Sequence, residues 1–359
     1  MFLAMRELAY AKLRYALIAL IMFLLSFLVL FVSGLAQGLA TDNAAGIMNM
    51  DADYFVLDEE AENQLTRSIV SETDQEAVAS FSDKAEPIGI HMAQIEDGEG
   101  SLADIAFMSF EKGSKWFPEV IEGDAPTKNG EIIADESLQS EGFKVGSTVH
   151  DSASDRTFTL VGFSKNQRYG HSPILHLSED DWTEMGGAEF VSSGLILESL
   201  TGEEAEQLAS KLNEGVVVSH SDVLSGIPGY SAEQGSLTMM IVFLFIISAF
   251  VLAAFFYVMT IQKLTQFGIL KAIGAKSKEL AKAVFFQIVI LSAVSVGLGI
   301  GATLLVGSLL PEGMPFHLDS ELIGLLAALF FAVAVLGSLL SLVKVMKVDP
   351  LEAIGGGAE

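Results

Sequence analysis

The sequence contains no cysteine, and its 20 Lys and Arg are outnumbered by 46 Asp and Glu. The lack of cysteine excludes disulfide bonds, thiolate metal sites and thiol nucleophiles. A phosphate-binding G-x-x-x-x-G-K-[ST] loop is also missing. The 6 histidines show no H-E-x-x-H spacing, so a zinc hydrolase is unsupported. We therefore expect no catalytic residues and no metal site of the ordinary kinds, and we do not interpret the chain as an enzyme.

Basic residues are scarce in one part of the chain only. Residues 41–235 hold 10 Lys and Arg against 38 Asp and Glu, whereas the rest holds 10 against 8. The whole chain is nevertheless 51% hydrophobic. The acidic part is therefore a polar domain inserted into a hydrophobic frame. Its negative charge would repel phosphate backbones, which makes nucleic acid an unsuitable partner.

Four stretches without a charged residue are longer than the roughly 20 residues that a helix needs to cross the hydrocarbon core of a bilayer. They are residues 15–40, 234–262, 283–310 and 322–343. The first is much longer than the apolar core of a signal peptide, so we interpret it as a permanent span. The sequence predicts a membrane protein with four transmembrane α-helices and an extracytoplasmic domain between helices 1 and 2.

The short polar segments predict the orientation, because Lys and Arg accumulate on the cytoplasmic side. Basic residues gather in residues 1–14, 263–282 and 344–359, whereas residues 311–321 contain acidic residues and no basic one. We expect the protein to lie in the cell membrane, with both termini and segment 263–282 on the cytoplasmic side. Residues 1–14 mix basic with apolar side chains, which is typical of an amphipathic helix along the inner surface or of a positive flank that fixes the topology.

The outer segment, residues 41–233, is long enough for one α+β domain. Alternating or β-branched runs predict strands at residues 53–57, 131–134, 157–161 and 215–218. Apolar positions at helical spacing predict a helix at residues 203–212, between apolar runs at 195–197 and 216–218, and a second helix is expected at 71–80. Acidic runs in this domain are typical of solvated faces.

Three motifs resemble the FtsX and MacB group of ABC transporter permeases, also called type VII. Residues 266–275, QFGILKAIGA, resemble the loop that the group writes as an acidic residue before G-I-L-[RK]-A-[IL]-G-A. Residues 348–354, VDPLEAI, resemble its D-P-[AIL]-E-A-[IL] ending, and residues 123–133 resemble its outer-domain pattern. The pair Gln266-Phe267 departs from the usual Arg-Glu type. Within the group, residues 1–15 and 33–39 resemble hemin-exporting permeases of the HrtB type.

This resemblance implies a homodimer of this chain, in contact with membrane lipid, with two copies of an ABC ATPase subunit that binds ATP and Mg. The chain itself would carry no cofactor. Work from the ATPase would pass through a coupling segment whose residues are Phe267, Gly268, Ile269, Leu270, Lys271, Ile273 and Gly274, with Asp349, Pro350 and Glu352 as a second contact. The alternatives are an ordinary amphipathic connector for the first set and a helix end for the second.

The resemblance also implies hemin as the transported substrate. Hemin requires an apolar surface for its macrocycle, an axial ligand for iron and cations for its propionates. The candidate residues are Tyr169, Tyr230 and His171 as ligands, Arg168 as the propionate partner, and Met239 and Met240 as an apolar entrance. Alternatively, residues 168–171 form a polar turn and Tyr230 is an interfacial aromatic residue.

Two other functions remain open from the sequence. In the first, an ABC exporter of the same kind would export another hydrophobic cargo, such as a peptide, an antibiotic or a lipid. A protein of the FtsX kind would move no substrate and would instead transmit ATP-driven motion to a cell-wall hydrolase outside the membrane. The cluster of Arg168, Tyr169 and His171 favours hemin among these.

Overall fold

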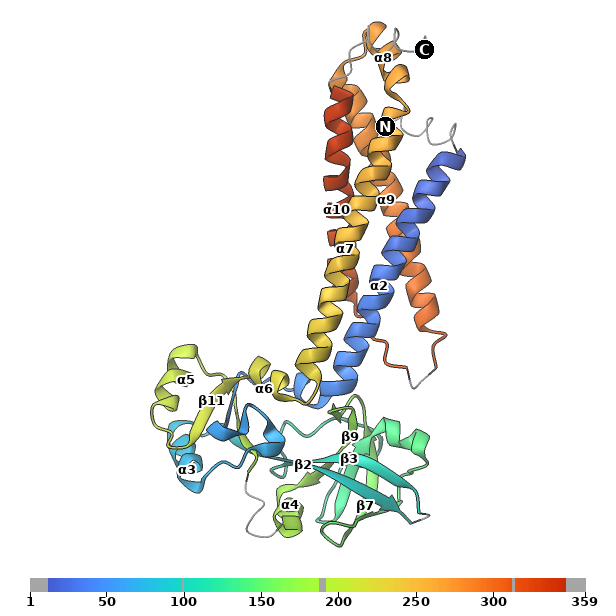
Figure 1. Cartoon of the computed structure of the whole chain (residues 1–359). Helices are drawn as coiled ribbons and strands as arrows, with labels where there is room; N and C mark the ends of the chain where they lie inside the picture. Colours follow the sequence, from blue (N-terminus) through green and yellow to red (C-terminus); the bar gives the residue numbers. More distant parts are fainter. Residues whose placement is uncertain (1–11, 99, 187–191, 312–313, 347–359) are drawn as a thin grey trace. The chain divides into compact units, whose positions relative to one another are not determined.

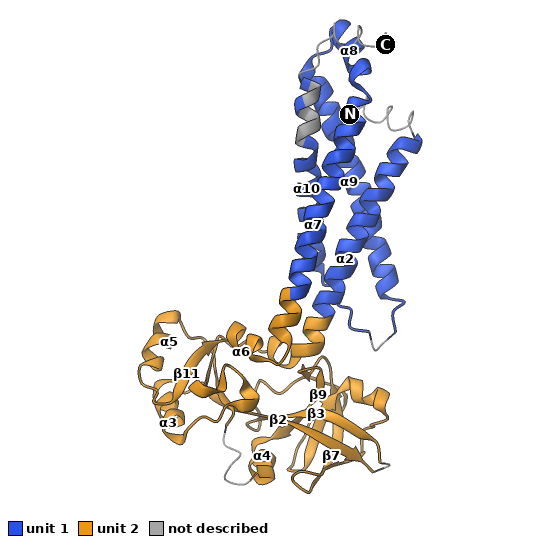
Figure 2. Cartoon of the chain, viewed as in Figure 1, with its two compact units in different colours: residues 1–38, 236–359 blue, residues 39–235 orange. Residues whose placement is uncertain are grey.

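The computed structural model describes residues 12–98, 100–186, 192–311 and 314–346 and divides the chain into two compact units (Figures 1 and 2). Unit 1 comprises residues 1–38 and 236–359, and unit 2 comprises residues 39–235. Apart from residues 12–14, the predicted surface helix at 1–14 lies outside the described residues. Asp349, Pro350 and Glu352 lie outside them as well.

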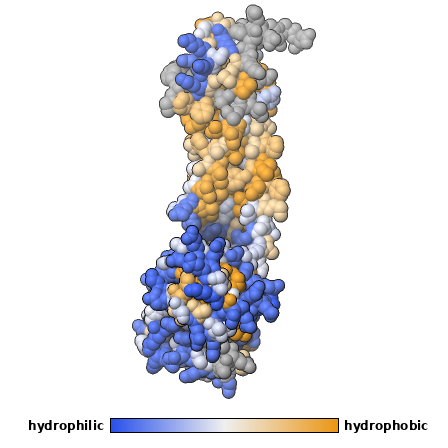
Figure 3. Space-filling view, turned by 90° about the vertical axis from the view of Figure 1, so that its left-hand side faces the viewer, coloured by the Kyte–Doolittle hydropathy of each residue, from blue (hydrophilic) through white to orange (hydrophobic). Residues whose placement is uncertain are grey.

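Unit 1 consists of long apolar helices, and the prediction of four membrane helices is confirmed. Among the described residues, 4 helices are long and apolar enough to cross a membrane. These helices are α2 (Lys12–Met48), α7 (Tyr230–Ile261), α9 (Ser277–Gly307) and α10 (Ser320–Met346). A short helix, α8 (Leu264–Ala272), lies between α7 and α9. On the face shown in Figure 3, hydrophobic residues cover the middle of this unit.

One apolar core joins the helices of unit 1. Its buried members include Met22 of α2, Phe256 of α7, Ile288 of α9 and Phe330 of α10. Small residues let the helix backbones approach closely: a Cβ atom on Gly299 of α9 would lie 2.4 Å from the Ser26 hydroxyl oxygen of α2. The ends of α2 and α7, residues 39–48 and 230–235, belong to unit 2.

Unit 2 is the predicted α+β domain. Among the described residues its strands run in the order β11-β1-β10-β2-β3-β9-β5-β7-β4, with β6 and β8 off this path. The strands are β1 (Tyr54–Asp58), β2 (Glu86–Asp97), β3 (Leu102–Phe110), β4 (Val120–Gly123), β5 (Glu131–Asp135), β6 (Thr148–Asp151), β7 (Arg156–Ser164), β8 (Arg168–Tyr169), β9 (Ser172–Ser178), β10 (Gly194–Leu197) and β11 (Gly215–Ser219). The predicted strands at 53–57, 131–134, 157–161 and 215–218 are confirmed.

Part of this sheet closes on itself. Strand β2 pairs with β3, β3 with β9, β9 with β5, β5 with β7, β7 with β6, and β6 again with β2. A closed barrel leaves few free edges and encloses its side chains. Phe107, Phe158, Phe163 and Leu175 are among the buried side chains of its core.

The remaining strands carry helices on both faces. Alternate residues of β1 face opposite ways: Val56 packs in a core with α3 (Glu72–Phe81) and α5 (Gly202–Ala209), whereas Phe55 and Leu57 pack with α6 (His220–Gly226) and the end of α2. The predicted helices at 71–80 and 203–212 are confirmed. The other short helices are η1 (Glu59–Ala61), η2 (Leu65–Arg67), η3 (Glu136–Glu141) and α4 (Glu179–Gly186).

Candidate functional site

A tight hairpin connects β8 to β9 and contains Arg168, Tyr169 and His171, three of the residues predicted to bind hemin. Arg168 pairs with Pro173 and Tyr169 with Ser172, so the turn consists of Gly170 and His171. Both have left-handed backbones, with φ angles of 57° and 66°. Two such residues form the type I′ turn that matches the twist of a hairpin, and histidine adopts this conformation more readily than most side chains.

Arg168 is bound to the last turns of α2. Its Nε and Nη2 atoms donate to Asp42 Oδ1 at 3.0 and 2.6 Å, and Nη1 donates to the Ser137 hydroxyl at 2.8 Å. The Gly170 amide donates to the Asn43 carbonyl oxygen at 2.7 Å. The guanidinium, proposed from sequence for a propionate, is therefore paired with a carboxylate of the same chain.

His171 joins α2 to α7. Its Nδ1 lies 2.8 Å from Asp42 Oδ2, and its Nε2 lies 3.2 Å from Glu233 Oε1. Asn43 Nδ2 donates to the other Glu233 oxygen at 3.1 Å. Burial disfavours the charged imidazole, but the hydrogen bonds and charges of Asp42 and Glu233 outweigh it and raise the pKa of His171. Two acceptors of this kind are satisfied together by the doubly protonated ring.

We call Asp42, Asn43, Arg168, His171 and Glu233 the hairpin clamp. Their contacts connect the ends of α2 and α7 with a hairpin of the outer domain, and all five lie in unit 2. Side-chain exposures of 22–38% in the ion pairs leave the charges open to screening by solvent. The sequence indicates Arg168 and His171, but no local pattern indicates their partners on α2 and α7.

The other predicted hemin residues occupy different surroundings. Tyr169 is 1% exposed and packs in the apolar core beneath the hairpin, and burial raises its pKa to about 12, which Thr66 opposes only in part. Its phenol therefore does not face solvent in this conformation. Tyr230 is half-buried against the same core. Met239 and Met240 are exposed on α7.

A second polar cluster lies within unit 1. Tyr15 of α2, Lys263 after α7 and Gln287 of α9 are all nearly fully buried. Lys263 Nζ donates to the Tyr15 hydroxyl and, at 3.4 Å, to Gln287 Oε1, while the Tyr15 hydroxyl donates to the same amide oxygen at 3.2 Å. We call these residues the Lys263 cluster. It connects three membrane helices directly before α8 begins.

The predicted coupling segment has two faces. Phe267 and Gly268 are buried, and Phe267 belongs to the core of unit 1 together with the half-buried Leu270. Ile269 and Ile273 are 50% and 77% exposed. In this conformation Phe267 therefore packs α8 against the membrane helices of unit 1. Ile269 and Ile273 are the large apolar side chains of α8 and its end that stay open to a partner.

The remaining predicted residues of this segment lie at its end. Lys271 Nζ donates to the carbonyl oxygen of Met346 at 3.2 Å. Gly274 has a φ of 103°, which favours glycine, and follows the last turn of α8. The left-handed Gly274 thus ends α8, and the Lys271 contact attaches α8 to the end of α10.

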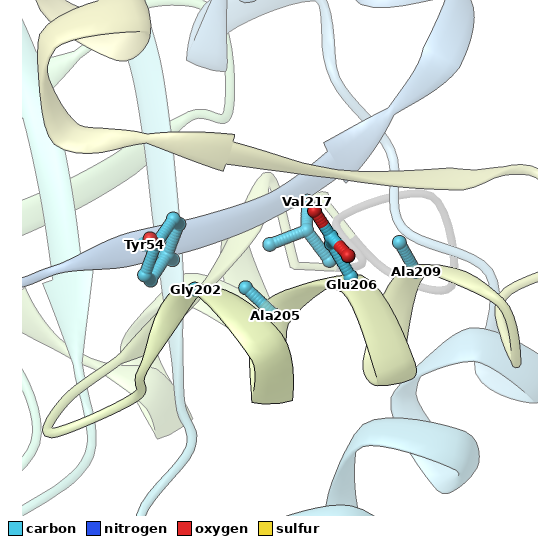
Figure 4. A pocket seen from close by; sticks show the side chains of 6 residues that line it. All are labelled: Tyr54, Gly202, Ala205, Glu206, Ala209 and Val217. Carbon is cyan, nitrogen blue, oxygen red and sulfur yellow. The ribbon is translucent and has the colours of Figure 1, made fainter.

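An open pocket of about 280 Å³ lies on unit 2 between α5 and β11 (Figure 4). Figure 4 shows Tyr54 and Val217 on the sheet side and Gly202, Ala205, Glu206 and Ala209 along the helix. The Glu206 carboxylate would repel propionates, so this pocket does not suit hemin. In the part of the chain that the structure describes, no group of His, Asp and Glu side chains is arranged to hold a metal ion.

The fold defines a four-span membrane protein with an α+β extracytoplasmic domain inserted between its first two spans. Residues 238–350 match the family model described as FtsX-like permease C-terminal. A protein of Staphylococcus haemolyticus named as a hemin transport system permease protein HrtB is 36% identical over 356 residues, which covers 99% of each chain. The protein of the same name from Staphylococcus epidermidis is 35% identical over 359 residues, again with 99% of each covered.

The chain therefore belongs to the FtsX-like permeases of ABC transporters, a family whose members work with an ATPase partner. This membership supports the interpretation of the chain as a transport subunit rather than an enzyme. Among solved structures, the periplasmic region of MacB from Actinobacillus actinomycetemcomitans is similar at 14% identity and a TM-score of 0.38, covering 50% of this chain and 94% of that one.

Proposed function

We propose that this chain is the permease subunit of an ABC exporter that takes hemin from the membrane and expels it outward, and so detoxifies heme. The observation that carries the proposal is the 36% identity, along 99% of both chains, to a permease named for hemin transport. Hemin is hydrophobic and partitions into lipid, so a permease with four spans needs no wide aqueous pore for it.

The proposed assembly is a homodimer with two ATPase subunits. Basic residues in segments 1–14, 263–282 and 344–359 support cytoplasmic termini and a cytoplasmic α8. The exposed Ile269 and Ile273 then form the apolar contact with the ATPase, since such side chains fill grooves in a partner. Asp349, Pro350 and Glu352 remain a proposed second contact.

Motion from the ATPase would pass along the helices to the outer domain. The Lys263 cluster joins the end of α7 to α2 and α9, so a displacement of α8 moves three helices together. The hairpin clamp then connects α2 and α7 to the β8–β9 hairpin by ion pairs with N–O distances of 2.6 to 3.2 Å. In this proposal these side chains are positioning residues and do not touch hemin while the clamp is closed.

The proposed ligands become accessible when the clamp opens. Tyr169 is buried beneath the hairpin and Arg168 is held by Asp42. Release of the hairpin would expose the Tyr169 phenol and free Arg168 for a propionate. Tyr230 and His171 would complete the site in unit 2. Met239 and Met240, exposed on α7, remain a separate proposal as an apolar entrance. Phenolate is a good ligand for ferric iron, which supports the choice of tyrosines.

A hemin titration of the purified full chain in detergent tests the proposal through the Soret band. We expect a saturable, shifted band that is lost in the Tyr169→Phe and Tyr230→Phe double variant. Tyr257→Phe, which changes a 37% exposed tyrosine elsewhere on α7, is the matched control and should bind like the parent. Asp42→Asn should strengthen binding, because it weakens the clamp over Tyr169.

The outcomes separate the function from the site. A parent chain that shows no saturable hemin binding contradicts hemin export and favours another hydrophobic cargo or transmission of motion to a cell-wall hydrolase. Hemin binding that the double variant retains would remove the tyrosine site and leave the exporter standing.

A further inference from the structure

Three phenylalanines of α2 form a row of stacked rings. The ring centroids of Phe23 and Phe27 lie 6.2 Å apart at an interplanar angle of 22°, and those of Phe27 and Phe31 lie 5.7 Å apart at 21°. Side chains four residues apart lie on one side of a helix, so the row covers about 12 Å of the span. All three rings are half-buried.

This row occupies a flank of α2 that differs from its neighbours. The buried side chains of the helix include Tyr15, Ile18, Met22 and Val29, and the large apolar side chains at 42–78% exposure are Leu13, Leu17, Leu20, Leu24 and Leu28. The large apolar side chains that α2 exposes are thus leucines, and its three phenylalanines lie on the adjacent flank. A requirement for lipid contact alone does not explain this separation, because leucine meets it.

A fourth ring extends the row from a distant part of the chain. Phe316 lies in the segment between α9 and α10, and its ring centroid is 5.5 Å from that of Phe31 at an interplanar angle of 30°. The four rings therefore form one continuous series within unit 1. We call Phe23, Phe27, Phe31 and Phe316 the aromatic row.

Glycines form the socket that places Phe316. A Cβ atom on Gly34 would lie 2.5 Å from a carbon of the Phe316 ring, and one on Gly307 would lie 2.6 Å from it. The His317 amide donates to the Gly34 carbonyl oxygen at 3.0 Å. Gly34 and Gly38 have the small-xxx-small spacing that usually receives another membrane helix, yet here they receive Pro315 and Phe316.

We infer that the aromatic row is the surface within the membrane on which the porphyrin ring of hemin stacks. This inference rests on the proposed function. Aromatic faces attract a flat macrocycle in offset stacking, whereas an acyl chain packs equally well on leucine. Residues 15–41 of α2 contain no charged side chain, so the propionates stay at the polar boundary beyond the row. The exposed His317 gives the row a polar end beside Phe316.

Iron-free protoporphyrin IX tests the row separately from any iron ligand. The probe is titrated into the full chain in lipid nanodiscs and followed by its fluorescence. A parallel hemin titration is followed by its Soret absorbance, and both are compared among variants. The triple variant Phe23→Leu, Phe27→Leu and Phe31→Leu should bind protoporphyrin roughly tenfold or more weakly, since three stacking contacts are lost. Gly34→Ala, which displaces Phe316, should produce a smaller loss.

Phe250→Leu is the matched control, because Phe250 is 74% exposed on α7 and lies outside the row. It should bind both probes like the parent. Should the triple variant not assemble, Phe31→Leu and Phe316→Leu alone should each weaken protoporphyrin binding.

Each result has a distinct meaning. If the parent binds hemin and the row variants bind protoporphyrin as the parent does, the row proposal is overturned and the proposed function is not. A row variant that loses only co-purified lipid, with porphyrin affinity unchanged, also overturns it and makes the row a lipid contact. If the parent binds neither porphyrin, the proposed function fails together with the row.

Discussion

The two polar clusters on α2 are built in opposite ways. The Lys263 cluster is nearly fully buried, and its hydroxyl, ammonium and amide groups satisfy one another. The hairpin clamp uses full ion pairs, but its side chains are 22–38% exposed. Buried hydrogen bonds to a charge are strong and insensitive to salt, whereas partly exposed ion pairs are weak and respond to salt and pH.

This difference suggests that the Lys263 cluster and the hairpin clamp have different mechanical roles at the two ends of α2. In the proposed mechanism, the buried cluster holds three helices as a unit on which α8 acts. The clamp would close and open at low energetic cost, as the proposed access of hemin to Tyr169 requires. We therefore expect the Lys263 cluster to be rigid and the hairpin clamp to be adjustable.

The largest effect is expected at Phe267. Phe267→Ala removes a 1% exposed ring from the core of unit 1 and should lower the free energy of unfolding by about 3 kcal/mol. Denaturation of the purified chain in mixed detergent measures it. Ile273→Ser, on the exposed face of α8, should leave stability within about 0.5 kcal/mol but weaken binding of the ATPase. Equal destabilisation by both variants would contradict the two faces of α8.

Tyr15→Phe should be the next most damaging change. It removes an acceptor from a buried ammonium while it keeps the ring, and it should cost about 2 kcal/mol in the same assay. Adding Lys263→Met should restore part of this loss, because the charge that needs a partner is then gone. A double variant that is less stable than Tyr15→Phe would show that Lys263 stabilises the helices by another contact.

Asp42→Asn should have a smaller effect on stability. The variant loses the ion pairs to Arg168 and His171, which are worth about 1 kcal/mol at this exposure. Raising the salt concentration should destabilise the parent more than the variant, because only the parent has the pairs to Asp42 to screen. Thermal unfolding of the full chain at low and high salt measures the difference. Equal salt responses would show that the clamp carries no net electrostatic stabilisation.

The smallest effect is the pH dependence of the clamp. The pKa of His171 is raised from its ordinary value of 6.5, so its stabilisation is complete below that value and is lost as the pH rises through the folded-state pKa. Asp42, Glu233 and the neighbouring Arg168 are the charged groups that face it. The parent should therefore lose stability relative to His171→Asn as the pH rises from below 6.5 through the raised folded-state pKa of His171.

Asparagine also adopts the left-handed backbone, so this variant keeps the turn. His91→Asn, at an exposed histidine of β2, controls for other titrations. An identical pH profile for the parent and His171→Asn would contradict the clamp's sensitivity to protonation.

The fold could be predicted from the sequence because its strongest signals are local. Apolar runs beyond 20 residues admit few alternatives to membrane helices. The helices nevertheless extend beyond the apolar runs: α2 continues to Met48 through Thr41, Asp42 and Asn43. Hydropathy does not report this extension, since helix propagation through polar residues depends on the packing of Ala44 and Ile47 in the outer core.

The candidate site could be predicted only in part. Arg168 and His171 stand out by their density in the sequence, but Asp42 lies 126 residues away, which no local pattern indicates. One local signal was available: neighbouring residues of a strand point to opposite faces, so Arg168 and Tyr169 of β8 do not face the same surroundings. The aromatic row shows the same limit, because Phe316 joins it only through the folded chain.

ATP-driven movement of hemin tests the central claim most directly. The chain is reconstituted in lipid vesicles with its ATPase partner, and hemin transfer from the membrane to an acceptor on the side of the outer domain is followed after ATP addition. We expect saturable transfer that requires ATP and that Asp42→Asn uncouples from ATP hydrolysis. Hydrolysis of ATP by the intact complex without any hemin transfer would contradict the account.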